Sequence, residues 1–436
     1  MDKQVIKQKT GIDSFLVFVF GVAIMISSDT LAVLGTFFGK TGNIGFILIV
    51  FSAIIYLALL SQCKQLFILS PVRFSDIEIL KSAFGILPAM FPFFVKMIAI
   101  VFLSTGLLVS SGFVFNEVFL YWFPNFGFAF VLLGLLLSLQ FLPNKVVFYL
   151  QIGFAGIPIL GFLILIIAGI IQTDQLIQFN PESIAYSINN VGLDTFFMPL
   201  LFFIGFDLGF TVWIKSDQKH PGKFNVLSTA VIFMCILFVL WGYVSLKYVP
   251  AEKLINTSIP HMIAAKNILG DPGRFIMGII VISGSLAAIH ALFTIISKQS
   301  SLLLKIARLP ENTKVAKIFI IFPALIIAGM MAGGMAGEEE LETFIRASLI
   351  LWLTSYAMIS LSHIIILSQS PQRHQRAWPK KISIMCLLIL GTGILILTIM
   401  DDNSMLILKF LGGALFISFI PGVLLMLRDK MTERLK

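Results

Sequence analysis

The sequence has 436 residues, of which 58% are hydrophobic and only 12% are charged. Soluble proteins carry about 25% charged residues, so a chain with half of that share cannot cover its surface with polar groups in water. We therefore expect lipid to be its solvent, which excludes disordered, nucleic-acid-binding and soluble secreted proteins. The net charge of +9 does not change this, because the basic residues lie in short loops between apolar runs and indicate topology.

Apolar runs long enough to cross a hydrocarbon core, which takes about 20 residues, occur twelve times in the sequence. They are expected at 13–37, 43–66, 88–113, 126–142, 146–172, 192–214, 224–248, 273–303, 316–336, 343–368, 381–400 and 404–427. Residues 1–10 are polar and the first run is too long for a signal peptide, so we expect it to be retained. No long hydrophilic stretch remains, and the sequence predicts a single all-α transmembrane domain over 1–436.

The basic residues are distributed unevenly between the two sets of loops. If the N-terminus is cytoplasmic, the inner side holds 23 of the 31 Lys and Arg residues and the outer side holds 7. The outer loops at 338–342 and 401–402 carry acidic residues instead. This asymmetry predicts a multi-pass protein of the cytoplasmic (inner) membrane with both termini in the cytoplasm.

Two of the twelve spans are interrupted. The first contains the polar run Ser27, Ser28, Asp29 and Thr30, and the sixth contains Gly205 and Asp207 within the run 202–207. Short polar residues can bond the backbone groups that an unwound helix frees in a membrane. Interrupted spans at matching positions in two halves predict an inverted-repeat transporter with its site near the bilayer midplane.

Several motifs resemble those of the amino acid–polyamine–organocation permeases, in the order expected of that family. The sixth span contains Ile204-Gly205-Phe206-Asp207 and is followed by Lys219-His220-Pro221; the eighth runs from Ser285 through Ser297-Lys298 to Leu309-Pro310; and the first ends in Lys40-Thr41-Gly42. Together with the spacing of the spans, the resemblance covers 13–427.

The resemblance implies a LeuT-like fold with broken helices 1 and 6. Its first five-helix repeat would be 13–172, its inverted second repeat 192–368, and two further helices would follow at 381–427. By implication the function is secondary transport of amino acids or organic amines by alternating access. The family builds its substrate site from the first and sixth spans, where helix N-termini favour an anion. The positions concerned here are Ser27, Ser28, Asp29, Thr30, Phe202, Phe203, Ile204, Gly205 and Phe206.

The first break departs from the family pattern. The family usually has a glycine-rich run there, whereas this sequence has Ser28-Asp29-Thr30. An ionised Asp29 would repel a substrate carboxylate, so Asp29 is either neutral or faces a cationic amine. The sequence is thus less consistent with ordinary α-amino acids than the family is.

Each ionisable residue inside a span needs an explanation, because burying it in a membrane costs about 2.5–3.5 kcal/mol on insertion scales. Asp29 can bind an amine, carry a proton, or cap the second half of a broken helix. Asp207 can act as a gate or proton group, or cap the sixth-span break. The phenylalanines at 202, 203 and 206 can line a substrate pocket or simply face lipid.

Three further residues are candidates for coupling or gating. His290 in the eighth span can relay protons or simply hydrogen-bond between helices. Lys96 near the start of the third span can extend to the interface or serve as a buried cation that replaces a coupling ion. Ser285 corresponds to one sodium-coordinating hydroxyl of LeuT-like relatives, but the set is partial. We therefore expect H⁺ coupling or ion independence in preference to Na⁺.

The cysteines and the motif content of the sequence bear on competing functions. Cys63, Cys235 and Cys386 stand singly and predict no disulfide or metal site, and no catalytic motif occurs. We expect no enzyme activity, no cofactor and no metal, and either a monomer or a homodimer. The alternative function is a membrane receptor or sensor with a transporter fold that binds an amino acid or amine without translocation.

Overall fold

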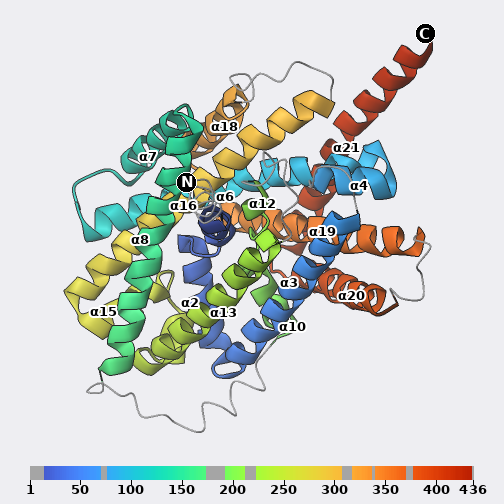
Figure 1. The fold of residues 1–436 in the computed structure, drawn as a ribbon. Helices are drawn as coiled ribbons and strands as arrows, with labels where there is room; N and C mark the ends of the chain where they lie inside the picture. The colour runs from blue at the N-terminus through green and yellow to red at the C-terminus, as the bar shows by residue number, and fades with distance from the viewer. Residues whose placement is uncertain are drawn as a thin grey trace, which may run out of the picture.

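The computed structural model describes residues 14–69, 76–172, 192–211, 222–306, 317–335, 339–369 and 377–434, and the regular elements within these ranges are helices (Figure 1). Before the labelled helices, residues 14–22 are helical. The others are α2 (Ser28–Thr41), α3 (Ile44–Leu69), α4 (Asp76–Phe84), α5 (Ile86–Ala89), α6 (Phe91–Val118), α7 (Asn125–Gln140), α8 (Asn144–Ile171), α10 (Leu193–Phe197), α11 (Pro199–Phe202), α12 (Leu208–Thr211), α13 (Gly222–Tyr248), α14 (Ala251–Ile255), α15 (Pro260–Leu269), α16 (Asp271–Ile306), α18 (Ile321–Ala332), α19 (Glu339–Gln369), α20 (Ala377–Ile399) and α21 (Ser404–Arg434).

Membrane-spanning helices account for most of the described chain. Seven are long and apolar enough to cross a membrane on their own, and four shorter apolar helices lie at 125–140, 193–202, 321–332 and 404–420. With the interrupted first span at 14–41, the described residues contain the twelve expected apolar segments. The predicted all-α membrane protein is therefore confirmed.

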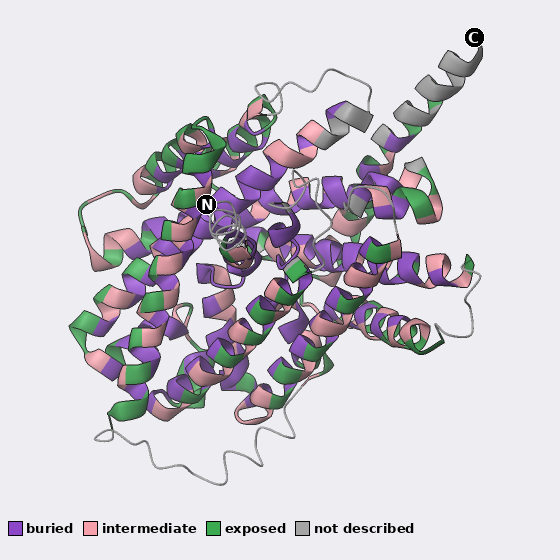
Figure 2. Ribbon diagram, in the orientation of Figure 1, coloured by how far each residue is buried: buried purple, intermediate pink, exposed green. Residues whose placement is uncertain are grey.

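The centre of the molecule is formed by α6 and α16, which are the most buried of the long helices (Figure 2). α16 packs against both α6 and α8, and α19 packs against α6 and α20. Small residues make this close packing possible, since a side chain on Gly161 of α8 would collide with Ile280 of α16. Helices in lipid associate through such small residues because no hydrophobic effect drives them together.

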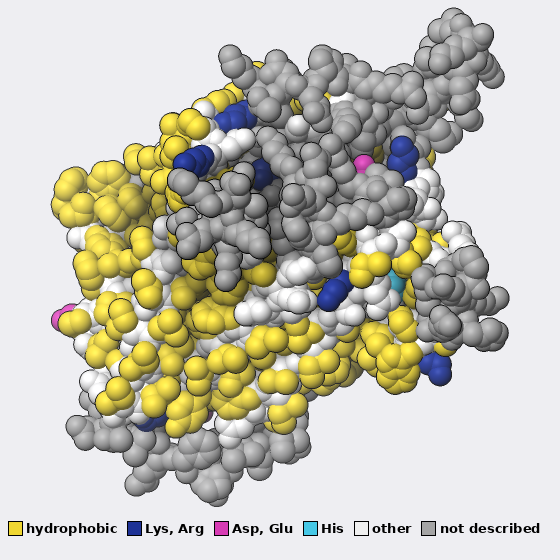
Figure 3. All heavy atoms as spheres, viewed as in Figure 1, with side chains coloured by type: hydrophobic (Ala, Val, Ile, Leu, Met, Phe, Trp, Pro, Cys, Tyr) yellow, Lys and Arg dark blue, Asp and Glu magenta, His cyan; other side chains and the backbone are white. Residues whose placement is uncertain are grey.

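The outer surface of the bundle is apolar. Large hydrophobic side chains such as Ile47, Leu160 and Phe322 are more than half exposed, and Figure 3 shows hydrophobic side chains over much of the visible face. A surface of this kind would aggregate in water, whereas it is the expected surface of a protein in contact with lipid.

Two sides of the membrane can be distinguished by following the spans in order. We call the side on which segment 14–22 begins the N-side, and the opposite one the far side. α14 and α15 connect α13 to α16 on the far side and contact α2 there. α4 and α5 precede α6 on the N-side, and α4 contacts both α6 and α19.

Candidate functional site

The first span is unwound over residues 23–27, between segment 14–22 and α2. Ser27 is the N-cap residue of α2, and the hydroxyl of Thr30 donates a hydrogen bond to the carbonyl oxygen of Ile24 at 3.2 Å. The break was predicted, but the polar run was expected to be the unwound segment itself. The helix resumes at Ser28 instead: Ser27 is a residue type favoured at the N-cap, and Asp29, considered above as a cap, lies in the first turn, where an acid is favourable.

The sixth span is unwound over residues 203–207, between α11 and α12, where the sequence predicted a break. Gly205 has a φ of 98°, a conformation that residues with a Cβ rarely adopt. A Cβ at this position would also lie 2.8 Å from the side chain of Ile24. Glycine therefore permits both the backbone conformation of this turn and the close contact with Ile24 in the first break.

The two breaks lie against each other and against α16. Besides the contact between Gly205 and Ile24, the N-side halves of both spans are close, since a Cβ on Gly209 would lie 2.7 Å from the carbonyl oxygen of Val17. On the other side, a Cβ on Gly284 of α16 would collide with the carbonyl oxygen of Ile26. Segments almost 180 residues apart thus form one unwound centre inside the bundle.

An ion pair ties the sixth break to α6. Lys96 Nζ lies 2.5 Å from Asp207 Oδ2, and the two side chains are only 2% and 1% exposed. The ammonium also lies 5.8 Å from the ring centroid of Trp352 on α19. The interpretation in which Lys96 extends to the membrane interface is therefore wrong: the buried carboxylate compensates the buried cation and holds it in the interior.

A tyrosine completes this cluster. The hydroxyl of Tyr356 on α19 donates to Asp207 Oδ1 at 2.6 Å and accepts from the backbone N–H of Gly205 at 3.1 Å. One side chain thus bonds both the acid and a backbone group that the break has freed. We call Lys96, Asp207 and Tyr356 the buried cluster.

Aromatic rings surround the break on the side of α3. Tyr56 donates to the carbonyl oxygen of Leu200 at 2.6 Å, and its ring lies 5.5 to 5.8 Å from those of Phe203, Phe206 and Tyr356. Phe202 packs against Phe37 of α2 and Phe238 of α13, and Phe238 also packs against Phe203.

Sequence reasoning missed both tyrosines. The chain has 43 Phe and only 7 Tyr, and five of these tyrosines lie inside the predicted spans, where a buried hydroxyl needs a partner. That rarity marks five candidates, and only the structure separates the buried Tyr56 and Tyr356 from exposed ones such as Tyr149 and Tyr243.

Asp29 lies in the first turn of α2, away from the buried cluster. Ser110 of α6 donates to its Oδ1 at 3.4 Å. Its Oδ2 is buried and has no hydrogen-bond partner within the described chain. That oxygen faces Gly106 of α6, where an added Cβ would lie 3.3 Å from it and would collide with Ile345 of α19.

The α16 residues singled out by sequence are distributed between two faces. Ser285 lies 3.0 Å from the hydroxyl of Ser28 and so belongs to the first break. His290 faces α8, where its Nδ1 lies 2.7 Å from Gln151 Oε1. Because an amide oxygen only accepts, Nδ1 carries the proton. The structure does not bring His290 to the buried cluster.

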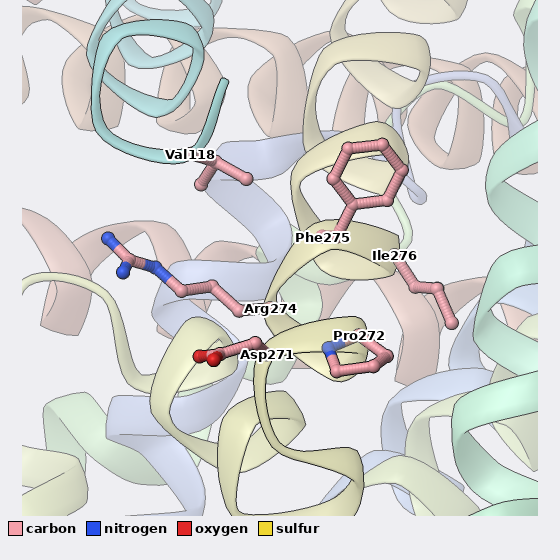
Figure 4. A pocket seen from close by; sticks show the side chains of 6 residues that line it. All are labelled: Val118, Asp271, Pro272, Arg274, Phe275 and Ile276. Carbon is pink, nitrogen blue, oxygen red and sulfur yellow. The ribbon is translucent and has the colours of Figure 1, made fainter. Parts of the chain in front are cut away.

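A surface pocket lies outside this centre, beside the start of α16 (Figure 4). It is lined by Val118, Asp271, Pro272, Arg274, Phe275 and Ile276. Arg274 pairs with Glu117 of α6 at 2.7 Å, and the Glu117 side chain is 47% exposed. The pair joins the far-side ends of α6 and α16 and contains none of the predicted site residues.

No family model and no curated protein matches the sequence. In fold, the chain is similar to a manganese transporter of Eremococcus coleocola, solved in complex with an aromatic bis-isothiourea substituted compound, with a TM-score of 0.54 over 97% of this chain and 96% of that one, at 14% identity. It is also similar to Mhp1, a nucleobase-cation-symport-1 family transporter solved in a closed conformation with bromovinylhydantoin bound, with a TM-score of 0.57 over 94% and 91% of the chains, at 14% identity. These likenesses confirm the expected LeuT-like fold. The narrower assignment to the amino acid–polyamine–organocation permeases stays a prediction.

Proposed function

We propose that the protein is a secondary transporter that moves amino acids or related organic amines across the membrane by alternating access. The contact between the two breaks, where Gly205 lies against Ile24, is the observation that carries this proposal. Unwound backbone at membrane depth is tolerated where protein buries it or where it lines a cavity, and transporters use paired breaks of this kind to bind their substrates. The two solved structures of similar fold are transporters by description.

The substrate would bind between the breaks. On one side are Ser27, Ser28, Asp29 and Thr30; on the other is the run 202–206. Ser27 and Thr30 lie 3.2 Å apart through their hydroxyls, and the rings of Phe203 and Phe206 pack beside Tyr56. Polar groups on one face and aromatic rings on the other suit a small ligand with an amine and an apolar part.

The buried cluster would serve coupling and gating. Lys96 already supplies a cation to Asp207, so the sixth break needs no inorganic ion to neutralise its acid. This supports proton-linked or ion-independent transport over Na⁺ coupling. Because Tyr356 bonds both Asp207 and the backbone of Gly205, movement of the break has to disturb this cluster.

The charge distribution supports a cytoplasmic N-side. Under that orientation 23 of the 31 basic residues face the cytoplasm, as the positive-inside rule requires. Both termini would then be cytoplasmic, and α14 and α15 would lie outside the cell.

The test is reconstitution of the purified protein into liposomes with a panel of labelled amino acids and amines. Uptake is measured with an inward proton gradient, with an inward sodium gradient and with neither. We expect saturable uptake of at least one compound, with no stimulation by sodium. Specific binding without uptake under all three conditions would contradict transport and indicate the receptor function instead.

A further inference from the structure

The charge of the unwound centre does not balance. Three of the described acidic and basic side chains lie in or beside the two breaks: Asp29, Asp207 and its partner Lys96. Lys96 and Asp207 neutralise each other at 2.5 Å. Asp29 is left with Ser110 as a neutral partner for Oδ1 and with an unpartnered, buried Oδ2.

No basic side chain of the described chain makes an ion pair with Asp29. Lys96 is too far away to pair with Asp29. Gly106 of α6 faces Asp29, and Lys96 lies ten residues before Gly106 on the same helix, which is about 15 Å of helix rise. Arg346 lies one residue from Ile345 but is held by Asp401, with bonds of 2.7 and 3.2 Å.

Asp29 also occupies the position that would otherwise attract a substrate carboxylate. The first turn of a helix favours one negative charge, through the backbone N–H groups and the helix dipole. In α2 Asp29 supplies this negative charge. A substrate carboxylate at the same turn would be a second anion beside the carboxylate of Asp29. Repulsion between the two would be strong, because the dielectric constant is low there.

The depth of Asp29 suits a substrate contact. It lies twelve positions before Thr41, the last residue of α2, which is about 18 Å of helix rise, so it lies near mid-membrane rather than at the far-side surface. It follows directly on the first break and faces α6 and α19. A carboxylate at this depth whose Oδ2 has no hydrogen-bond partner can bind an ammonium group without losing an existing hydrogen bond.

We propose that Asp29 is the counter-ion of the substrate's ammonium group, and that the protein selects organic amines that lack a carboxylate over zwitterionic amino acids. The inference rests on the proposed function, which places a substrate beside the first break. Its test, however, is a binding measurement that does not depend on transport.

The test uses ligand pairs that differ only by a carboxylate: phenethylamine and phenylalanine, tyramine and tyrosine, agmatine and arginine, cadaverine and lysine. Each compound is titrated against the purified protein in nanodiscs at pH 7, and binding is read from the rise in Tm. We expect at least one amine to bind and its carboxylated partner to bind at least about tenfold more weakly, because Asp29 would repel the added carboxylate.

Substitutions at Asp29 test whether its carboxylate is responsible for the selectivity. Asp29→Asn should abolish the Tm rise caused by the amine, while Asp29→Glu should retain it. Asp194→Asn is the matched control, because Asp194 is an acid in the first turn of another half-helix and should leave binding unchanged. Size-exclusion chromatography and the ligand-free Tm establish that each variant is folded.

The wild-type comparison stands even if Asp29→Asn does not fold. Equal binding of amine and amino acid in a pair whose amine binds, or no binding by any compound, would overturn the inference. Unchanged amine binding in folded Asp29→Asn would overturn it as well. Amine binding without uptake in liposomes would contradict the proposed transport while leaving this inference intact.

Discussion

At the scale of single residues, the site is organised by a few polar side chains whose partners lie on other helices. Lys96 and Asp207 are 111 positions apart in the sequence, and Tyr356 lies 149 further on. The sequence identified Lys96 and Asp207 as exceptional because charges are rare in apolar spans. It could not pair them, because no local pattern encodes which faces of two distant helices meet.

The ion pair should be detectable in a double-mutant cycle. Lys96→Met and Asp207→Asn should each lower the free energy of unfolding by about 3–5 kcal/mol, since each single change leaves a buried group without its partner. The double variant should lose less than the sum of the two, because it leaves no unpaired charge. The free energy of unfolding is measured by heat or denaturant in detergent for the wild type, the two single variants and the double variant. Lys145→Met, at an exposed position, is the control. Additive losses would show that the pair is not coupled.

The tyrosine bridge gives a second prediction at this scale. Tyr356→Phe removes one hydroxyl that bonds both Asp207 and the N–H of Gly205, so it should destabilise the protein by about 1–3 kcal/mol. Tyr243→Phe removes a hydroxyl from a side chain on α13 that is 49% exposed, and it should change little. The Tm of each variant is compared with that of the wild type. Equal Tm changes in Tyr356→Phe and Tyr243→Phe would contradict the bridge.

At the scale of elements, the breaks show what a sequence can and cannot locate. The sixth break was predicted where it occurs, because Gly205 is a direct signal for backbone that a side chain disfavours. The first was expected over Ser27–Thr30 but occupies 23–27. Polar residues mark where the helix restarts, while the unwound residues before them are mostly apolar and lie against α16 and the sixth break, contacts that no local sequence pattern encodes.

The far-side helix α15 leads to a prediction about pH. His261 lies there outside the membrane-spanning segments and is 4% exposed, and neither ring nitrogen has a hydrogen-bond partner within the described residues. Burial lowers the pKa of His261 from 6.5 to about 4, so the packed helix disfavours the protonated form. The unfolded state binds the proton first as the pH falls.

The packing of α15 should therefore be fully stable above about pH 6.5 and lose up to about 3 kcal/mol as the pH falls toward 4. Hydrogen exchange of residues 260–269 at pH 7.5 and pH 5, corrected for intrinsic rates, measures this loss. His261→Gln should remove the dependence on pH in this range. A wild-type protein with equal protection at both pH values would contradict the assignment.

At the scale of the whole molecule, hydrophobicity and charge determined most of what the sequence could predict. The twelve apolar segments and the all-α class follow from composition and spacing, because lipid permits few other structures. The LeuT-like arrangement was implied by the order of the motifs, and the solved structures of similar fold confirm it. The identity of the substrate depends on the positions of a few atoms between the breaks, which composition does not encode.

If the protein is a transporter as proposed, its substrate crosses the membrane where the two breaks meet. The most direct measurement is saturable uptake of the labelled amino acids and amines into proteoliposomes. Liposomes that contain equal amounts of the wild type, Gly205→Val or Gly391→Val are compared. Valine at Gly205 meets Ile24 and a positive φ, whereas Gly391 on α20 has open space around it. We predict uptake by the wild type and Gly391→Val and none by Gly205→Val; wild-type uptake by Gly205→Val would contradict the claim.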